Sequence, residues 1–238
     1  MFKRIRQRLA LRAEIASLDA ELEREPRPSL ADPQLAGPGP DGQGAIVWRI
    51  PVDGGKDVHM TLKGMEWGHD PYVVPVCAKR FYRTWLRRGL VSQSQPDAPA
   101  LRRDIPQHRK YRWAEQGFAA ADQSNPVPLA RVHACATDRG DSFAFTDGVT
   151  RTLWLIANGA KAFPVTTGDR EDAKRIAEAA GIGQPIRVAD LVERMERRAT
   201  PPTRPPEPPQ SIFSEGMGGR MPKPPRAPRR PRSGGYEL

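Results

Sequence analysis

The sequence predicts an α+β fold, in which one mixed domain of strands and helices is flanked by segments of other composition. Short β-rich runs alternate with helical patterns over residues 45–198. Proline and glycine crowd residues 26–44, and 11 of the 26 prolines lie in residues 199–238 beside seven basic residues. We therefore expect an amphipathic helix at 1–25, a flexible linker at 26–44, a folded domain at 45–198 and a disordered Pro/Arg-rich tail at 199–238.

The first 25 residues carry a helical pattern. Apolar residues recur there at steps of three and four, which places them on one face of a helix. Basic residues fill the first half and acidic residues the second, an order that the helix dipole disfavours, so the helix should be weak alone. The seam is typical of a docking helix or a short coiled coil that would make a dimer, and peripheral association with an anionic membrane surface is the alternative. Its members are Leu11, Ile15, Leu18 and Leu22.

Two β-rich runs open the domain, at residues 44–52 and 57–64. The turn signal Asp53-Gly54-Gly55 separates them and predicts a hairpin. A third strand is expected at 71–76, where Pro75 has no N–H for a ladder and therefore favours a sheet edge.

The rest of the domain alternates between helical and extended patterns. After the third strand we expect a helix at 78–88 that Gly89 stops, and then a polar loop that runs to Pro99. Gly159 and Gly181 stand where glycine commonly ends a helix. The remaining expected elements are strands at 128–136 and 141–147, a helix at 148–158, a strand at 162–167 and helices at 170–180 and 188–198.

Composition excludes several classes of protein. No run approaches the roughly 18 apolar residues that span a bilayer, and the N-terminus lacks a secretory signal, so we expect a cytoplasmic protein. Cys77 and Cys135 lie far apart without a CxxC partner, which argues against a zinc ribbon, a thioredoxin-like motif or a disulfide scaffold. The histidines lack the spacing of metal ligands, so we expect no metal site; they are His59, His69, His108 and His133.

Positive charge is concentrated in one region of a chain whose net charge is +10. Residues 79–118 hold ten basic and three acidic residues, interleaved with aromatic side chains. Such a mixture suits a phosphate backbone with bases stacked beside it. The alternative is a helix that buries Phe81 and Trp85 and exposes its arginines. The candidate nucleic-acid-binding residues are Arg80, Arg83, Arg87, Arg88, Arg102, Arg103, Arg109, Lys110 and Arg112.

A second candidate site lies where the strand at 141–147 turns into the next helix. The start of a helix exposes unpaired N–H groups and attracts anions. Asp147 is expected to cap the helix, Gly148 to let a phosphate approach, and Arg151 to reach the same place. The alternative is a capped helix whose arginine pairs with a neighbouring carboxylate. The candidate phosphate- or nucleotide-binding residues are Asp147, Gly148, Thr150, Arg151 and Thr152.

Three segments around this turn carry a resemblance to a known family. They are SNPVPLARV, FTDGVTRTLWLIANGA and AFPV, which occur in this order within residues 124–165. Together they resemble the ParB/sulfiredoxin-like fold, and among its members the plasmid fertility inhibition factors of the FiwA and Osa type. The resemblance covers about residues 60–183.

The resemblance implies a function. It implies a plasmid-encoded protein that blocks conjugative transfer of a co-resident plasmid. Its partners would be the coupling ATPase, other type IV secretion components or the transferred nucleoprotein, in the cytoplasm or at the inner face of the plasma membrane. ATPase and DNase activities are associated with the Osa type, which would make ATP and Mg²⁺ its cofactors.

The chain departs from the wider fold in the turn. Val149 and Thr150 replace the middle pair of the usual Gly-Arg-His-Arg or Gly-Glu-Arg-Arg pattern, and Arg151 alone is retained. Sulfiredoxin-like chemistry needs a cysteine there, and a nuclease without the histidine lacks its general base. We therefore expect a binding protein, with no assigned catalytic residue. The alternatives are a nuclease or ATPase, and a non-specific DNA-binding protein.

Overall fold

The protein is described by a computed structural model over residues 2–38, 44–62, 71–91, 98–138 and 140–199. Its helices are α1 (Phe2–Arg24), α2 (Ala78–Val91), α3 (Tyr111–Ala119), α4 (Val149–Ala157), α5 (Arg170–Ala180) and α6 (Val188–Ala199), with 3₁₀ helices η1 (Asp53–Gly55) and η2 (Arg102–Gln107). Its strands are β1 (Gln34–Pro38), β2 (Gly44–Pro51), β3 (Asp57–Leu62), β4 (Tyr72–Cys77), β5 (Val127–Pro128), β6 (Ala130–Thr137), β7 (Gly140–Asp147), β8 (Ala162–Thr167) and β9 (Ile186–Arg187).

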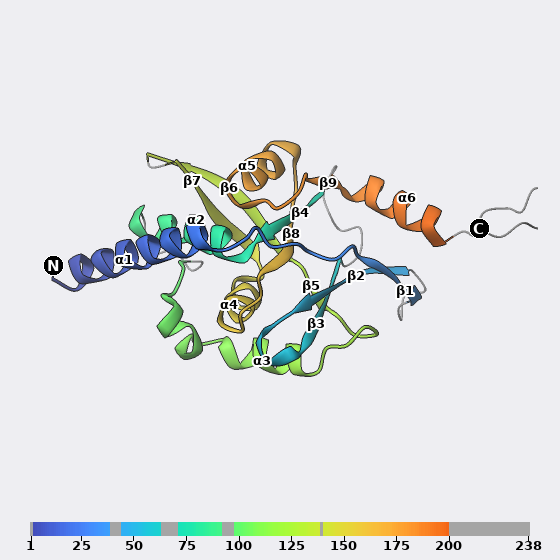
Figure 1. Cartoon of the computed structure of the whole chain (residues 1–238), viewed down its shortest axis with the longest axis horizontal. Helices are drawn as coiled ribbons and strands as arrows, with labels where there is room; N and C mark the ends of the chain where they lie inside the picture. The colour runs from blue at the N-terminus through green and yellow to red at the C-terminus, as the bar shows by residue number, and fades with distance from the viewer. Residues whose placement is uncertain (1, 39–43, 63–70, 92–97, 139, 200–238) are drawn as a thin grey trace, which may run out of the picture. The chain divides into compact units, whose positions relative to one another are not determined.

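Two mixed sheets and the helices around them make up the described part of the chain (Figure 1). One sheet has the order β1-β2-β3-β5 and the other the order β7-β6-β8-β4-β9. All neighbours are antiparallel except β3 with β5 and β6 with β8. The predicted α+β class is confirmed.

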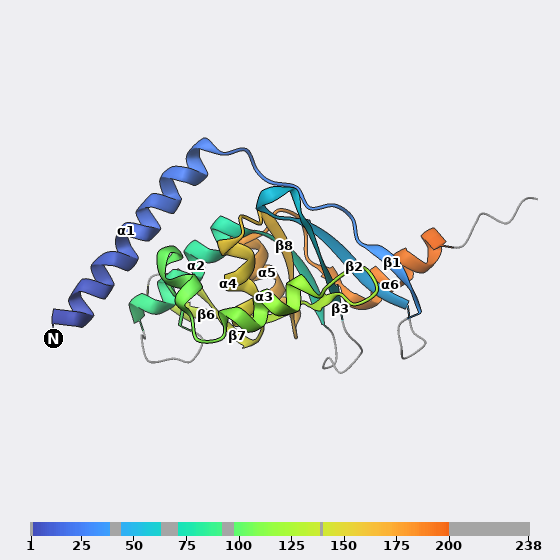
Figure 2. The ribbon, with the colours of Figure 1, turned by 90° about the horizontal axis from the view of Figure 1, so that it is seen from below.

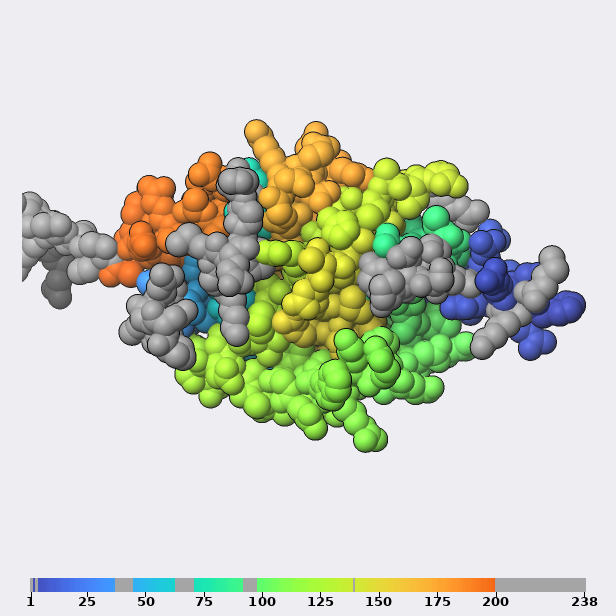
Figure 3. Space-filling view, turned by 180° about the vertical axis from the view of Figure 1, so that it is seen from behind, coloured from blue at the N-terminus to red at the C-terminus, as the bar shows by residue number. Residues whose placement is uncertain are grey.

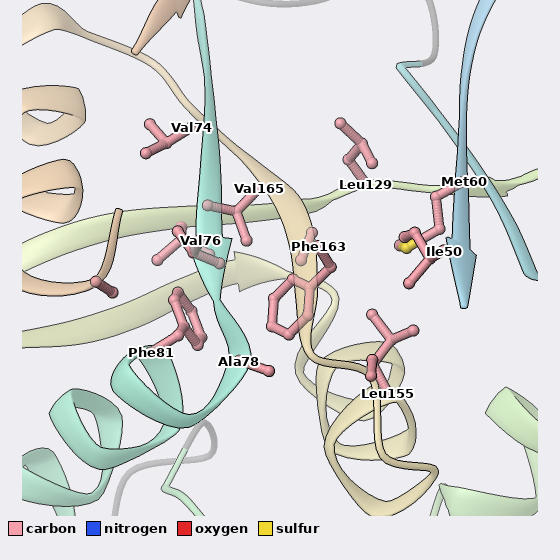
Figure 4. Packing of buried hydrophobic residues seen from close by; sticks show 14 of the residues in the cluster. Ile50, Met60, Val74, Val76, Ala78, Phe81, Leu129, Leu155, Phe163 and Val165 are labelled. Carbon is pink, nitrogen blue, oxygen red and sulfur yellow. The ribbon is translucent and has the colours of Figure 1, made fainter. Parts of the chain in front are cut away.

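One hydrophobic core joins the two sheets. Every residue of β8 is buried, as expected for an inner strand covered on both faces. The core cluster includes Phe163 from β8, Ile50 from β2 and Leu155 from α4, which Figure 4 shows at the junction of the sheets. On the other side, Phe81 of α2 stacks on Phe143 of β7 with ring centroids 4.6 Å apart. The helices therefore hold the sheets together through large apolar side chains.

Most expected elements are confirmed. The β2–β3 hairpin forms around η1, and the predicted strand at 57–64 ends at Leu62, beyond which residues 63 and 64 lie outside the described residues. The β6–β7 hairpin, α4, β8, α5 and α6 also form. The predicted disordered tail lies outside the described residues from position 200 on.

The prediction that Pro75 marks an edge strand is wrong. Strand β4 pairs with β8 on one side and with β9 on the other, so it lies inside the sheet. Pro75 faces Pro164 of β8 directly. An antiparallel ladder alternates between residue pairs that exchange N–H···O bonds and pairs that do not, and two prolines can share only the second kind of pair. The ladder therefore loses no bond at this position.

The prediction that Gly89 ends the helix after β4 is also wrong. Helix α2 continues through Gly89 to Val91. A Cβ atom at position 89 would lie 3.1 Å from Leu11 Cδ1 of α1. The glycine therefore allows close packing of two helices, which outweighs its poor helix propensity.

Two regions contain elements that the sequence did not indicate. Within the predicted linker at 26–44, β1 pairs with β2, and Arg27 Nη2 donates to the Gly181 carbonyl oxygen over 2.9 Å. Within the basic segment, η2 and α3 follow Pro99. Both regions have too little apolar periodicity to be recognised, and contacts with the rest of the domain order them.

Helix α1 docks on the domain through the expected seam. Leu11 and Leu18 are buried, and α1 runs along α2 (Figures 1 and 2). Around this seam, Arg102 of η2 pairs with Glu14 and Glu21 of α1. Arg102 and Lys79 lower the pKa of Glu21 to about 2, so this carboxylate stays charged well into the acidic range. The acidic half of α1 thus faces cations of the domain.

We predict that Leu18→Ala lowers the free energy of unfolding by about 2–4 kcal/mol, because it empties a buried site between α1 and the domain. Urea denaturation measures this change. The control is Val91→Ala, since Val91 is 49% exposed and its truncation should have little effect. Equal stability of the two variants would contradict docking through the seam.

Candidate functional site

The β7–α4 turn is shaped by one close approach. Gly148 adopts the left-handed conformation, with φ at 95°, and precedes the first residue of α4. A Cβ atom there would lie 2.5 Å from the Ala130 Cβ atom of β6. Both the dihedral angle and the lack of space therefore require glycine. Packing against β6 is the role that the structure gives to Gly148.

The prediction that Asp147 is the N-cap is wrong, because Gly148 occupies that position. The Asp147 carboxylate instead accepts the Gly148 N–H over 2.7 Å and pairs with Arg151 Nη2 over 2.5 Å. The Arg151 side chain is only 18% exposed, whereas that of Asp147 is 74% exposed. The carboxylate thus holds the guanidinium against the turn. Thr152 is buried, and its hydroxyl has no hydrogen-bond partner within the described residues, so it points into the core.

The turn borders a depression that we call the basic groove. One part of it, about 460 Å³, lies between His108–Lys110 and Phe145–Arg151. An adjoining part of about 260 Å³ shares Lys110, Thr150 and Arg151 and continues to Trp113 and Val127. On the face shown in Figure 3, the yellow atoms of α4 lie beside the green atoms of η2 and α3. The groove therefore brings together parts of both predicted candidate sites.

Helix α3 is held beside the turn by two contacts with α4. Phe118 stacks on Trp154, with ring centroids 4.2 Å apart. Asn158 Nδ2, just after α4, donates to the Tyr111 hydroxyl over 3.1 Å. The two contacts fix both ends of α3. Near its start Trp113 is 68% exposed, and its ring centroid lies 6.0 Å from Lys110 Nζ. An exposed indole beside cations can stack on a nucleobase.

The electrostatics of the basic groove favour an anion. Arg109, Lys110 and Arg151 bring three positive charges, against which Asp147 sets one negative charge. Burial, with further contributions from Arg109 and Lys110, lowers the pKa of His108 below its ordinary value. His108 is therefore mostly neutral at neutral pH and is able to take up a proton beside a bound anion.

The other candidate arginines lie elsewhere. Arg83 pairs with Asp19 of α1 over 2.6 Å, and Arg102 pairs with α1 as described above. Arg88 Nη1 lies 3.5 Å from the Cys135 sulfur, and Arg103 pairs with Asp104 at the exposed surface. Arg80 lines a separate cavity, which the segment after α1 borders.

Burial also divides the aromatic side chains of the basic segment. Phe81, Tyr82 and Trp85 are fully buried, which matches the alternative of a helix with an aromatic core face. Arg87 lies on the same helix at a half-buried position, and Arg112 lies exposed on α3. Trp113 is left as the exposed aromatic residue of this segment within the described residues.

Sequence reasoning did not select Trp113 or His108 as site residues. The run His108-Arg109-Lys110-Tyr111-Arg112-Trp113 held the signal, but it does not show which aromatic ring is buried. In the part of the chain that the structure describes, no three His, Cys, Asp or Glu side chains cluster as metal ligands would. No helix there is long and apolar enough to cross a membrane.

Comparisons with known proteins agree on one family. A family model described as plasmid fertility inhibition factor matches residues 73–181. Protein Osa of Shigella flexneri is 36% identical over 197 residues, which are 83% of this chain and all of that protein. The crystal structure of an oncogenic suppression activity protein, described as a plasmid fertility inhibition factor, superposes with a TM-score of 0.69 at 32% identity. That match covers 82% of this chain and 97% of the other.

We predict that Gly148→Ala destabilises the protein by about 2–4 kcal/mol, because the new methyl group both strains the left-handed backbone and overlaps Ala130. Thermal or urea unfolding measures the effect. Gly168→Ala is the matched control, since a Cβ atom there meets nothing within 4 Å and the backbone is not left-handed. A stable Gly148→Ala variant would show that the turn can relax.

A second prediction concerns pH. A phosphodiester in the basic groove should raise the pKa of His108, so binding takes up a proton and tightens as pH falls from about 8 to 6. This gain in affinity should be lost as the pH rises through the pKa that His108 has in the complex. Fluorescence anisotropy with a labelled single-stranded oligonucleotide measures this, and His108→Gln should remove the pH-dependent part. An unchanged pH profile in that variant would contradict the assignment.

Proposed function

The chain belongs to the plasmid fertility inhibition factor family, and we propose that it blocks conjugative transfer of a co-resident plasmid by binding the transferred single-stranded DNA in the basic groove. The observation that carries this proposal is the convergence of Lys110, Arg151 and Trp113 on one surface. These residues come from segments about 40 positions apart, and α3 and α4 hold them together.

Single-stranded DNA fits this groove better than a duplex does. Arg109 and Lys110 offer charges to successive phosphates, and Trp113 offers a ring to an unstacked base. Arg151 lies beside them, paired with Asp147. A duplex keeps its bases stacked and would leave the indole without a partner. Phosphate and stacking contacts of this kind do not depend on the base sequence of the strand.

Two alternatives use the same surface differently. An acidic patch on the coupling ATPase or another secretion component would also pair with these cations, and action at the inner face of the plasma membrane would bring the protein near that machinery.

A DNase or ATPase would need Mg²⁺, which commonly binds through one or two carboxylates and substrate phosphates. Asp147 is the carboxylate of the groove, and its ion pair with Arg151 competes with a cation. We therefore favour binding over hydrolysis.

We predict that the double variant Arg109→Glu/Lys110→Glu loses most affinity for single-stranded DNA. Both side chains are exposed, so the fold should persist. The slope of log affinity against log salt should shrink by about 0.7 for each lost phosphate contact. Arg103→Glu is the control, because Arg103 is an exposed arginine of the same segment outside the groove. The control reverses one charge and the groove variant two, so a control that loses half as much in log affinity would show that only net charge matters.

The same variants test the biological role. Expression of the chain in a donor cell should reduce transfer of a sensitive plasmid without changing its copy number or the growth of the donor. The groove variant should lose this inhibition and the Arg103→Glu control should keep it, while deletion of residues 199–238 should weaken it only partly. Full inhibition by the groove variant would show that inhibition does not depend on the cations of the basic groove. Plasmid degradation in the donor would favour the nuclease.

A further inference from the structure

Helix α1 carries a second apolar stripe, separate from the seam that docks on the domain. At 100° per residue, this stripe lies about 150° around the helix from the seam. Three large members are exposed: Phe2 by 80%, Ile5 by 47% and Leu9 by 57%. Large exposed apolar side chains at such regular spacing mark an interaction surface. In full, the stripe consists of Phe2, Ile5, Leu9, Ala13, Ala16 and Ala20.

The stripe faces away from the domain. The opposite side of α1, with Leu11 and Leu18, is buried against it. In Figures 1 and 2 the first turns of α1 extend past α2, so the large members of the stripe lie at a projecting end of the helix. A second helix can therefore approach the stripe without displacing the docked half.

The stripe changes in size along the helix. Its first half holds the large residues Phe2, Ile5 and Leu9, and its second half holds alanines. If two copies of α1 pack antiparallel about a midpoint near Leu11, Leu9 of one copy meets Ala13 of the other, and Ile5 meets Ala16. Large side chains then fill the space above small ones, which is the condition for close helix packing.

The charges select the same arrangement. The described basic residues of the first half are Arg4, Arg6, Arg8 and Arg12, and exposed Glu23 borders the stripe in the second half. Acidic residues of the second half already pair with cations of their own domain, so the charges of this half are largely balanced. Antiparallel packing sets the basic half of each copy beside this balanced half, whereas parallel packing sets the two basic halves together. An anionic lipid surface would attract the first half but repel the exposed Glu23.

We propose that two copies of this chain dimerise through an antiparallel pair of α1 helices that meet along this stripe. Each helix then packs one face on its own domain and the opposite face on the partner copy. Ion pairs with its own domain stabilise the acidic half of α1, which accounts for a charge order that disfavours an isolated helix.

Sedimentation of the full chain over a range of concentrations tests this proposal. Wild type should reach twice the chain mass, and Ile5→Asp should raise the dissociation constant about tenfold or more, because it buries a charge in place of an apolar contact. Gln7→Asp is the control, since Gln7 is exposed on the side of α1 away from the stripe. A monomer at every concentration, or equal effects of both variants, would overturn the proposal.

Two further measurements separate the proposed arrangement from its rivals. Ala16→Phe should weaken the dimer by filling the small half of the stripe, whereas it would strengthen binding to anionic phosphatidylglycerol vesicles if the stripe met a membrane. A short thiol crosslinker should join Ile5→Cys chains to Ala16→Cys chains in a mixture, with the joined peptides identified by mass spectrometry. If two Ile5→Cys chains crosslinked more readily than an Ile5→Cys chain with an Ala16→Cys chain, the antiparallel arrangement would be overturned. A stronger dimer of the Ala16→Phe variant would overturn the match of large and small side chains.

Discussion

The close approach of Gly148 to Ala130 is the constraint on which the functional face depends. It fixes the left-handed turn at the end of β7, where Gly148 lies against Ala130 of β6. This turn determines the direction in which α4 leaves the sheet. The direction of α4 brings Trp154 under Phe118, and that stack positions α3. The basic groove therefore forms between elements that the chain separates by about 30 residues, because one glycine permits a contact that any other residue would block.

The structure divides the positive charge of the chain into two uses. Acidic residues of α1 neutralise Lys79, Arg83 and Arg102, which consequently serve to hold α1 on the domain. Arg109 and Lys110 lie beyond the reach of α1 and border the groove with Arg151. A charge run that looks continuous in the sequence thus contains a structural part and a part that is free to meet an anionic partner. Membership of the family follows from similarity over most of the chain, whereas the division of positive charge between α1 and the groove depends on the contacts of individual side chains.

Local patterns predicted the regular elements well. The two hairpins, α2, α4, β8, α5 and α6 follow from apolar periodicity and from turn residues, because these signals reflect interactions within a few positions. The errors arose where a distant contact outweighed the local signal. Leu11 of α1 packs so closely on Gly89 that a glycine is favoured inside α2. Pro164 opposite Pro75 makes a proline acceptable in an inner strand. Strand β1 is ordered by pairing with β2, which no local pattern in its own sequence indicates.

By itself, the sequence determined the α+β class, the apolar seam of α1, the family resemblance and the turn around Gly148 with its arginine. All of these depend on residue order or on the conformation of a few neighbouring residues. The tertiary structure alone decided which basic side chains face solvent, which aromatic ring is exposed and which part of the predicted site turns inward. Trp113 and Trp85 stand in similar local sequences, yet one is 68% exposed and the other is fully buried. The reason is physical: burial and ion pairing depend on which surfaces meet in space, and for α1, α2 and η2 those surfaces come from positions up to about 90 residues apart.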